Sequence, residues 1–169
     1  MATAKQELGE LGEQLVVRHC ACPKCKRART LRTLPPNFKC ADVICDFCGY
    51  LGQVKAKTYD DGVTPPAVLP GAAWAPQRER MDAGIYFPLF LVLVSPTAGV
   101  FSIHYLSADL QGRKMFVERE PLRPGSKKEG WTGFRYNLAS VADRLVRLVE
   151  GPLPAKRVRS VEALPRAAE

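Results

Sequence analysis

The chain has 169 residues, 46% of them hydrophobic, and a formal net charge of +8. This length suits one domain with its own core, and the longest apolar run, residues 85–94, is far shorter than the roughly 20 residues of a membrane-spanning helix. The charge favours an acidic polymer as partner. The N-terminus is polar and has no signal peptide, so we expect a reducing compartment, the cytoplasm.

The first predicted element is an amphipathic helix from Lys5 to Arg18. Leu8, Leu11 and Leu15 recur in it at helical spacing between glutamates. Two glycines lower its helix propensity and favour a close packing partner. The glutamates either form a solvated face or include one, Glu13, that leans over an active site.

Two C-x-x-C pairs follow and predict a closed Cys₄ zinc site that holds structure and does no chemistry. The alternatives are redox dithiols or unliganded core cysteines. Cys20 and Cys40 remain and are expected to be small buried hydrophobes, although Cys20 could replace Cys22 by a register shift. The predicted zinc ligands are Cys22, Cys25, Cys45 and Cys48.

A candidate catalytic set overlaps the second cysteine pair. Asp42 precedes that pair, and Gln53-Val54-Lys55 follows it. A hairpin with a strand at Asp42, a turn at the cysteines and a return strand would present all of these, with Gln53 and Lys55 on one face. Asp42 and the backbone carbonyl of Val54 are candidate Mg²⁺ ligands, and Lys55 is the cation that would act on the attacking water or on the phosphate.

Downstream, residues 59–70 read as a loop and residues 85–94 as a strand buried on both faces. Residues 95–99 predict a turn, so the strand at 85–94 and the strand that follows the turn should form a hairpin. The remaining expected elements are a helix at 71–83 interrupted near Pro76, a strand at 100–106, a short helix after Ser107, an edge strand at 114–118, an amphipathic helix at 138–150 and a disordered tail at 151–169.

Two basic segments are candidates for nucleic-acid binding. No acidic residue lies between Gln14 and Ala41, and residues 119–135 interleave cations with aromatics, as a loop that tracks phosphates and stacks on bases would. The alternatives are a solvated cationic face that offsets the zinc thiolates, and a solvated loop with Trp131 anchored in the core. The candidate residues are Arg29, Arg32, Lys127, Lys128 and Trp131.

Several pieces together resemble the PD-(D/E)xK nuclease superfamily, and most closely the catalytic domain of DpnI-type restriction endonucleases. The matching pieces run in order over roughly residues 10–140. They are Gly12-Glu13-Gln14 through Arg18, Cys22-Pro-Lys-Cys25, Ala41-Asp42-Val-Ile-Cys45-Asp-Phe-Cys48, Gln53-Val-Lys55-Ala-Lys57, Pro121-Leu-Arg-Pro124, Lys127-Lys128, Gly130-Trp131-x-Gly133 and Leu138.

The resemblance implies a restriction-endonuclease-like α/β fold, a mixed central sheet flanked by helices with an inserted Cys₄ zinc ribbon. It also implies DNA, duplex in form, as partner, structural Zn²⁺ and catalytic Mg²⁺. The family's Glu is Gln53 here, which lowers the negative charge of the site. DpnI-type enzymes append a winged-helix domain that reads methylated DNA, and we expect none within these 169 residues.

Three functions follow as hypotheses. The first is a Mg²⁺-dependent restriction-type DNA endonuclease, including a modification-dependent one, with residues 1–150 as the nuclease domain and 20–48 as its zinc module. The second is an inactive nuclease fold that binds nucleic acid, which Gln53 favours. The third is a zinc-ribbon adaptor for proteins, against which the basic segments argue.

Overall fold

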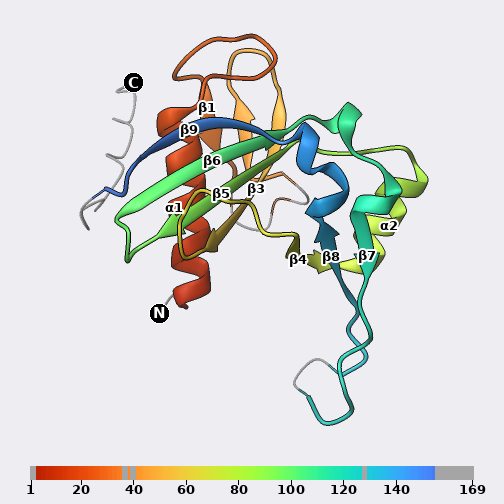
Figure 1. The fold of residues 1–169 in the computed structure, drawn as a ribbon. Helices are drawn as coiled ribbons and strands as arrows, with labels where there is room; N and C mark the ends of the chain where they lie inside the picture. The colour runs from red at the N-terminus through yellow and green to blue at the C-terminus, as the bar shows by residue number, and fades with distance from the viewer. Residues whose placement is uncertain (1–2, 36–37, 39–40, 127–128, 155–169) are drawn as a thin grey trace, which may run out of the picture.

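The computed structural model describes residues 3–35, 38, 41–126 and 129–154 (Figure 1). The described residues combine α-helices with a mixed β-sheet, so the expected α/β class is confirmed. The elements are α1 (Ala4–His19), β1 (Leu31–Thr33), β2 (Val43–Cys45), β3 (Leu51–Thr58), β4 (Val68–Ala73), α2 (Trp74–Asp82), β5 (Leu89–Ser95), β6 (Val100–Leu106), β7 (Phe116–Glu118), β8 (Gly133–Asn137) and β9 (Val146–Pro152), with 3₁₀ turns at Ala108–Leu110, Arg113–Met115 and Leu138–Arg144.

The central sheet is mixed and has six strands in the order β1-β2-β3-β5-β6-β9. β3 and β5 are parallel, with Gln53 opposite Leu89, and the other neighbours are antiparallel. β5 and β6 form the predicted hairpin through the turn at residues 96–99. The zinc-module strands β1 and β2 therefore extend the same sheet that contains β3.

A second sheet, which the sequence did not predict, has three strands in the order β4-β8-β7. The predicted flanking helices are present, with α1 against one face of the central sheet and α2 in the cluster on the other face, where the small sheet also packs. β5 contributes to both faces, because its side chains alternate between two separate apolar clusters. Phe90, Val92 and Val94 lie in one cluster with α1, whereas Leu89, Leu91 and Leu93 lie in the other with the small sheet and α2.

The predicted opening helix is confirmed as α1. Thr3 caps it, since its hydroxyl accepts from the N–H of Gln6 while the Gln6 side chain accepts from the N–H of Thr3. Gly12 is buried against β3, and a Cβ built there would lie 2.6 Å from the Cβ of Ala56. The close approach that the glycines predicted is thus present at Gly12, and it brings the next residue, Glu13, to the edge of β3.

The predicted helix at 138–150 is wrong. Residues 138–144 form a 3₁₀ turn, and residues 146–152 form β9, which pairs antiparallel with β6. This pairing satisfies backbone groups along the edge of β6 that a helix would leave open, so tertiary structure overrides the helical pattern. Ile103 of β6 pairs with Val149 of β9, whereas the next residue of β6, His104, pairs with Arg147. Leu148 is therefore an extra residue in β9, a β-bulge.

Smaller differences concern boundaries. The strand expected at 85–94 begins at Leu89, directly after Pro88. The helix expected at 71–83 begins only at Trp74, because residues 71–73 belong to β4. Pro76 then lies in the first turn of α2, where a missing N–H costs little. Of the tail predicted at 151–169, residues 151–152 end β9 and residues 155–169 lie outside the described part of the chain.

The connection from β7 to β8 is a hairpin that projects away from the rest of the molecule (Figure 1). Its two arms stay paired, since the N–H of Arg119 donates to Gly133 O and the N–H of Leu122 donates to Trp131 O. Among the described residues, none of the helices has the length and apolar character needed to cross a bilayer.

Candidate functional site

The four predicted cysteine ligands come together from two knuckles of the same backbone geometry. The N–H of Lys26 donates to the carbonyl of Cys22, and the N–H of Gly49 donates to the carbonyl of Cys45, both at 2.9 Å. Lys26 and Gly49 both take positive φ, 62° and 69°. Each C-x-x-C pair is therefore followed by a left-handed residue that turns the chain back over its two sulfurs.

The geometry of the cysteine cluster fits one tetrahedral ion. The four Sγ atoms lie within 4.8 Å of one another. The Sγ atoms of Cys22 and Cys48 are 3.6 Å apart, and those of Cys25 and Cys45 are 3.8 Å apart. Four sulfurs at about 2.3 Å from Zn²⁺ would be separated by about 3.8 Å. The cluster could therefore hold a zinc ion with all four positions filled by protein.

Two cysteines, Cys20 and Cys40, are not among the four predicted ligands. Cys20 is buried, and burial raises the pKa of its thiol to about 12, so it stays protonated and behaves as a small apolar side chain. Its Sγ is not part of the cluster, so the register alternative in which Cys20 replaces Cys22 is wrong. Cys40 lies outside the described residues.

Asp42 is held beside β3 by two hydrogen bonds. Its N–H donates to Gly52 O at 2.9 Å, and its Oδ2 accepts from the N–H of Val54 at 2.7 Å. The backbone N–H of Gln53 points the other way, to Pro88 O next to β5. The predicted hairpin is thus present, and Asp42 lies alongside Gln53 where β2 diverges from β3.

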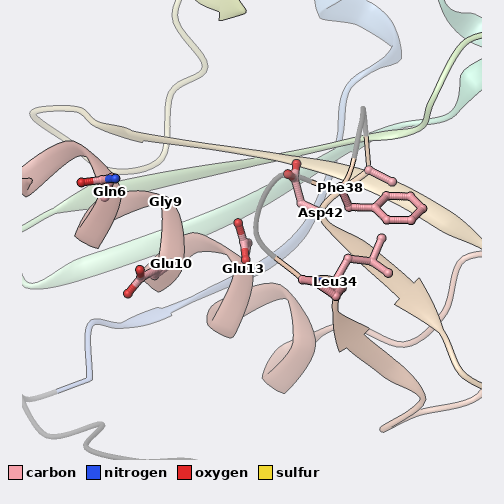
Figure 2. Close-up of a pocket in the computed structure, with 9 residues that line it drawn as sticks. Gln6, Gly9, Glu10, Glu13, Leu34, Phe38 and Asp42 are labelled. Atoms are coloured by element: carbon pink, nitrogen blue, oxygen red, sulfur yellow. The ribbon is translucent and has the colours of Figure 1, made fainter. Parts of the chain in front are cut away.

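A cavity of about 310 Å³ opens between α1 and the segment that leads to β2, and Asp42 lies on one wall. Figure 2 shows Glu13 on α1 and Asp42 on the facing segment, with Leu34 and Phe38 nearby. Phe38 is 50% exposed, so the cavity has an apolar rim beside its carboxylates. The lining residues are Gln6, Gly9, Glu10, Glu13, Leu34, Pro35, Phe38, Ala41 and Asp42.

Glu13 has the clearest electrostatic signature of the site. Desolvation is the main cause that raises the pKa of its carboxyl to about 7, and the negative charges of Asp42 and Glu10 raise it further, whereas the Lys55 ammonium lowers it. These couplings place Asp42 and Lys55 each within electrostatic range of Glu13. Two carboxylates that repel each other in a half-buried site are a donor set that a divalent cation would stabilise.

Gln53 and Lys55 lie on the opposite face of β3 from Val54, as the alternation predicted. Val54 packs in the cluster with α1, whereas Gln53 reaches the small sheet, where its Oε1 accepts a 2.6 Å hydrogen bond from the hydroxyl of Tyr136. Asp42, Gln53 and the Val54 carbonyl are oxygen donors of the kind that Mg²⁺ prefers. The backbone groups of Gln53 are directed toward β5. Those of the next residue, Val54, are directed to the opposite side of the strand, so the Val54 carbonyl lies on the side of Asp42.

The two arginines predicted to contact nucleic acid lie in the zinc module. Arg29 is exposed and has a positive φ of 60°. Arg32 is already engaged, since its guanidinium pairs with Asp46 at 3.0 Å and donates to the carbonyls of Arg29 and Leu31. The geometry therefore leaves Arg29 more available to a phosphate than Arg32.

Of the other predicted contacts, Trp131 lies on the projecting hairpin. Trp131 is half-buried, and its ring covers the backbone of Gly133, where an added Cβ would lie 2.7 Å from it. Lys127 and Lys128 lie outside the described residues. Trp131 therefore lies on the arm of the hairpin that leads into β8, and in the sequence it is far from the zinc module.

Tyr136 is the site residue that the sequence reasoning missed. It belongs to a stretch in which Phe134 and Tyr136 point inward and Arg135 outward, and this alternation is the signal of a strand. Placing residues 119–135 in one loop concealed it. No local pattern could indicate that the hydroxyl of Tyr136 reaches Gln53, since the contact joins two different sheets.

The chain was compared with models of known protein families. The DpnI model, described as the Dam-replacing family, matches residues 2–151. The matched range includes α1, the cysteine cluster, Asp42, β3 and the projecting hairpin.

Proposed function

Because the chain belongs to the DpnI family of restriction-type nucleases, we propose that it is a Mg²⁺-dependent endonuclease that hydrolyses phosphodiester bonds in duplex DNA. The observation that supports this most is the pairing of Asp42 with the Gly52–Val54 backbone, which sets a carboxylate beside Gln53 on the strand that also carries Lys55. The proposed activity includes cleavage that depends on modification of the DNA.

In this proposal Asp42, the Val54 carbonyl and the Gln53 amide oxygen hold Mg²⁺. The bound ion supplies charge neutralisation at the phosphate oxygens and a water of lowered pKa. Lys55 orients the attacking water or stabilises the negative charge on the phosphate. Glu13, with a pKa near 7, can exchange a proton beside Asp42 at neutral pH.

The cysteine cluster has a separate role. We propose structural Zn²⁺ there, because four cysteines leave no open coordination position for a substrate. Two of the cluster's cysteines, Cys45 and Cys48, lie at the turn of the β2–β3 hairpin, and Asp42 directly precedes β2. Zinc therefore stabilises the segment that positions Asp42 without taking part in cleavage.

Plasmid cleavage tests the proposal. Purified, zinc-loaded protein is incubated with adenine-methylated and unmethylated plasmid, with Mg²⁺, with Mn²⁺ or with neither ion added; omitting the ion is preferable to a chelator, which would also remove zinc. We expect nicked and linear DNA only with the added ion. Asp42→Asn should abolish it, while Asp46→Asn in the zinc module should not.

The neutral Gln53 favours a second candidate, a nuclease fold that binds duplex DNA without cutting it. Under this alternative the wild type stays inert on every plasmid, yet binds duplex DNA with an affinity that falls steeply with salt. The expected log–log slope is about −0.9 for each phosphate neutralised. Charge reversal at Arg29 should flatten that slope.

A further inference from the structure

Gln53 is joined to the small sheet by one side-chain hydrogen bond. The hydroxyl of Tyr136 donates to Gln53 Oε1 at 2.6 Å, across the boundary between β8 and β3. Along the sequence the two residues are far apart, and they belong to different sheets. The contact therefore exists only because the three-stranded sheet packs on the central one.

The donor is rigidly held. Tyr136 is 1% exposed, and its ring packs against Phe134 and Phe116, with centroids 5.0 Å and 5.4 Å away. A ring fixed on several sides fixes its hydroxyl as well. Gln53, in contrast, is half-buried and carries a flexible side chain that could rotate its terminal amide.

The chemistry of an amide makes this bond matter. A glutamate presents an oxygen to a cation in either orientation of its terminal group, but a glutamine presents an oxygen in one and an NH₂ in the other. An NH₂ directed at Mg²⁺ carries partial positive charge and cannot ligate it. A hydroxyl that donates to Oε1 selects one orientation and still leaves a second lone pair on that oxygen.

We propose that Tyr136 is a positioning residue for Gln53, and that its hydroxyl holds the amide in the orientation in which a glutamine can serve as an oxygen ligand of a divalent cation. The inference rests on the proposed function, because it takes Gln53 to be a ligand. It explains how a neutral side chain can act at this position, and it assigns to β8 a direct part in the metal site.

The test is a double-mutant cycle with Mn²⁺ binding as its first readout. Tyr136→Phe removes only the hydroxyl from a packed ring, and Tyr105→Phe is the matched control, since it removes a hydroxyl that is hydrogen-bonded to Tyr50. We expect Tyr136→Phe to weaken Mn²⁺ binding about tenfold, the usual scale for a residue that supports a ligand. Combined with Gln53→Glu, the same change should have little effect, because both orientations then offer an oxygen.

Cleavage and stability complete the test. High Mg²⁺ should restore the cleavage rate of Tyr136→Phe, and its melting temperature should match that of Tyr105→Phe. Equal Mn²⁺ affinity in wild type and Tyr136→Phe, or equal losses in both Gln53 backgrounds, would overturn the inference. If the wild type binds Mn²⁺ through Asp42 but cuts no DNA, the proposed endonuclease fails, while the Mn²⁺ cycle still decides the role of Tyr136.

Discussion

The cysteine cluster, which could hold zinc, and the Mg²⁺ site proposed beside β3 are built in opposite ways. In the cysteine cluster four equivalent ligands converge on one point, and two knuckles of matching backbone geometry present them. Beside β3, one carboxylate, one amide and one carbonyl come from different parts of the hairpin, and Glu13 is contributed by α1. The first arrangement is closed, and the second leaves room for water and substrate.

The difference separates stability from chemistry. An ion enclosed by four thiolates contributes to folding, because the site exists only in the folded chain. A site that holds a half-buried pair of carboxylates instead costs free energy until a cation arrives. Changes in the cluster should therefore alter the free energy of unfolding, and changes beside β3 should alter the cleavage rate.

The largest effect is expected from Cys45→Ser. The oxygen is a poor replacement for a thiolate, so zinc should be lost together with much of the ~5–15 kcal/mol by which a domain of this kind is stable. Elemental analysis and denaturant unfolding measure the two quantities. Cys20→Ser, outside the cluster, should keep its zinc. Folded wild-type protein without zinc would remove the basis of the comparison.

Lys55→Ala should have the opposite profile. Removing a cation from a site where negative charge develops should lower cleavage by about 10²–10³-fold, with the free energy of unfolding nearly unchanged. Lys57→Ala, two residues further along β3, is the control and should cleave normally. A loss of stability in Lys55→Ala as large as its loss of rate would break the separation.

Glu13→Gln should affect both quantities, in opposite directions. The native pKa of about 7 lies above the ordinary value of 4.5, so the native state binds the proton more tightly than the unfolded state does. The free energy of unfolding should therefore fall as pH rises from about 4.5 to about 7 and stay low above it. Allowing for partial exposure, the loss is about 1–2 kcal/mol.

Denaturant unfolding across this pH range, without Mg²⁺ and with zinc bound, measures the slope of the free energy of unfolding against pH. Glu13→Gln should remove it and be more stable than wild type above pH 7, while cleaving more slowly. Glu7→Gln, on the same helix, should keep the wild-type slope. Equal slopes in Glu13→Gln and wild type would contradict the assignment of this charge to the site.

The smallest effect concerns the residue that follows each knuckle, Lys26 in one and Gly49 in the other. Lys26 takes a left-handed conformation that costs a side-chain-bearing residue about 1–2 kcal/mol, and Gly49 takes it freely. Lys26→Gly should stabilise by about 0.5–1 kcal/mol after the added flexibility of the unfolded chain, and Gly49→Ala should destabilise by about 1 kcal/mol. Thermal unfolding of the two variants should give shifts of opposite sign.

The same contrast explains how far the sequence could be interpreted. The cysteine cluster depends on local spacing, and the hairpin that carries Asp42 and Gln53 follows from the same short segment. α1 and the β5–β6 hairpin were predictable from periodicity. Glu13 could only be offered as an alternative, because its approach to Asp42 depends on how tightly Gly12 packs on β3.

The elements that could not be predicted depend on distant partners. Residues 146–152 carry a pattern compatible with a helix, and only the edge of β6 makes them a strand. The small sheet joins β4 to β8 and β7, which are far apart in the sequence, so its existence and the bond from Tyr136 to Gln53 are invisible locally. Long-range pairing of this kind is decided by the whole fold.

The extra residue in β9 has a consequence for solubility. β9 is the last strand of the six-stranded order, and Val146 and Leu148 on it are 56% and 43% exposed. An exposed apolar edge strand is a template on which another chain can add a strand and begin to aggregate. The bulge at Leu148 interrupts the regular spacing of hydrogen-bonding groups along that edge. A second molecule therefore meets an edge whose hydrogen-bonding groups are unevenly spaced, which disfavours a long intermolecular ladder.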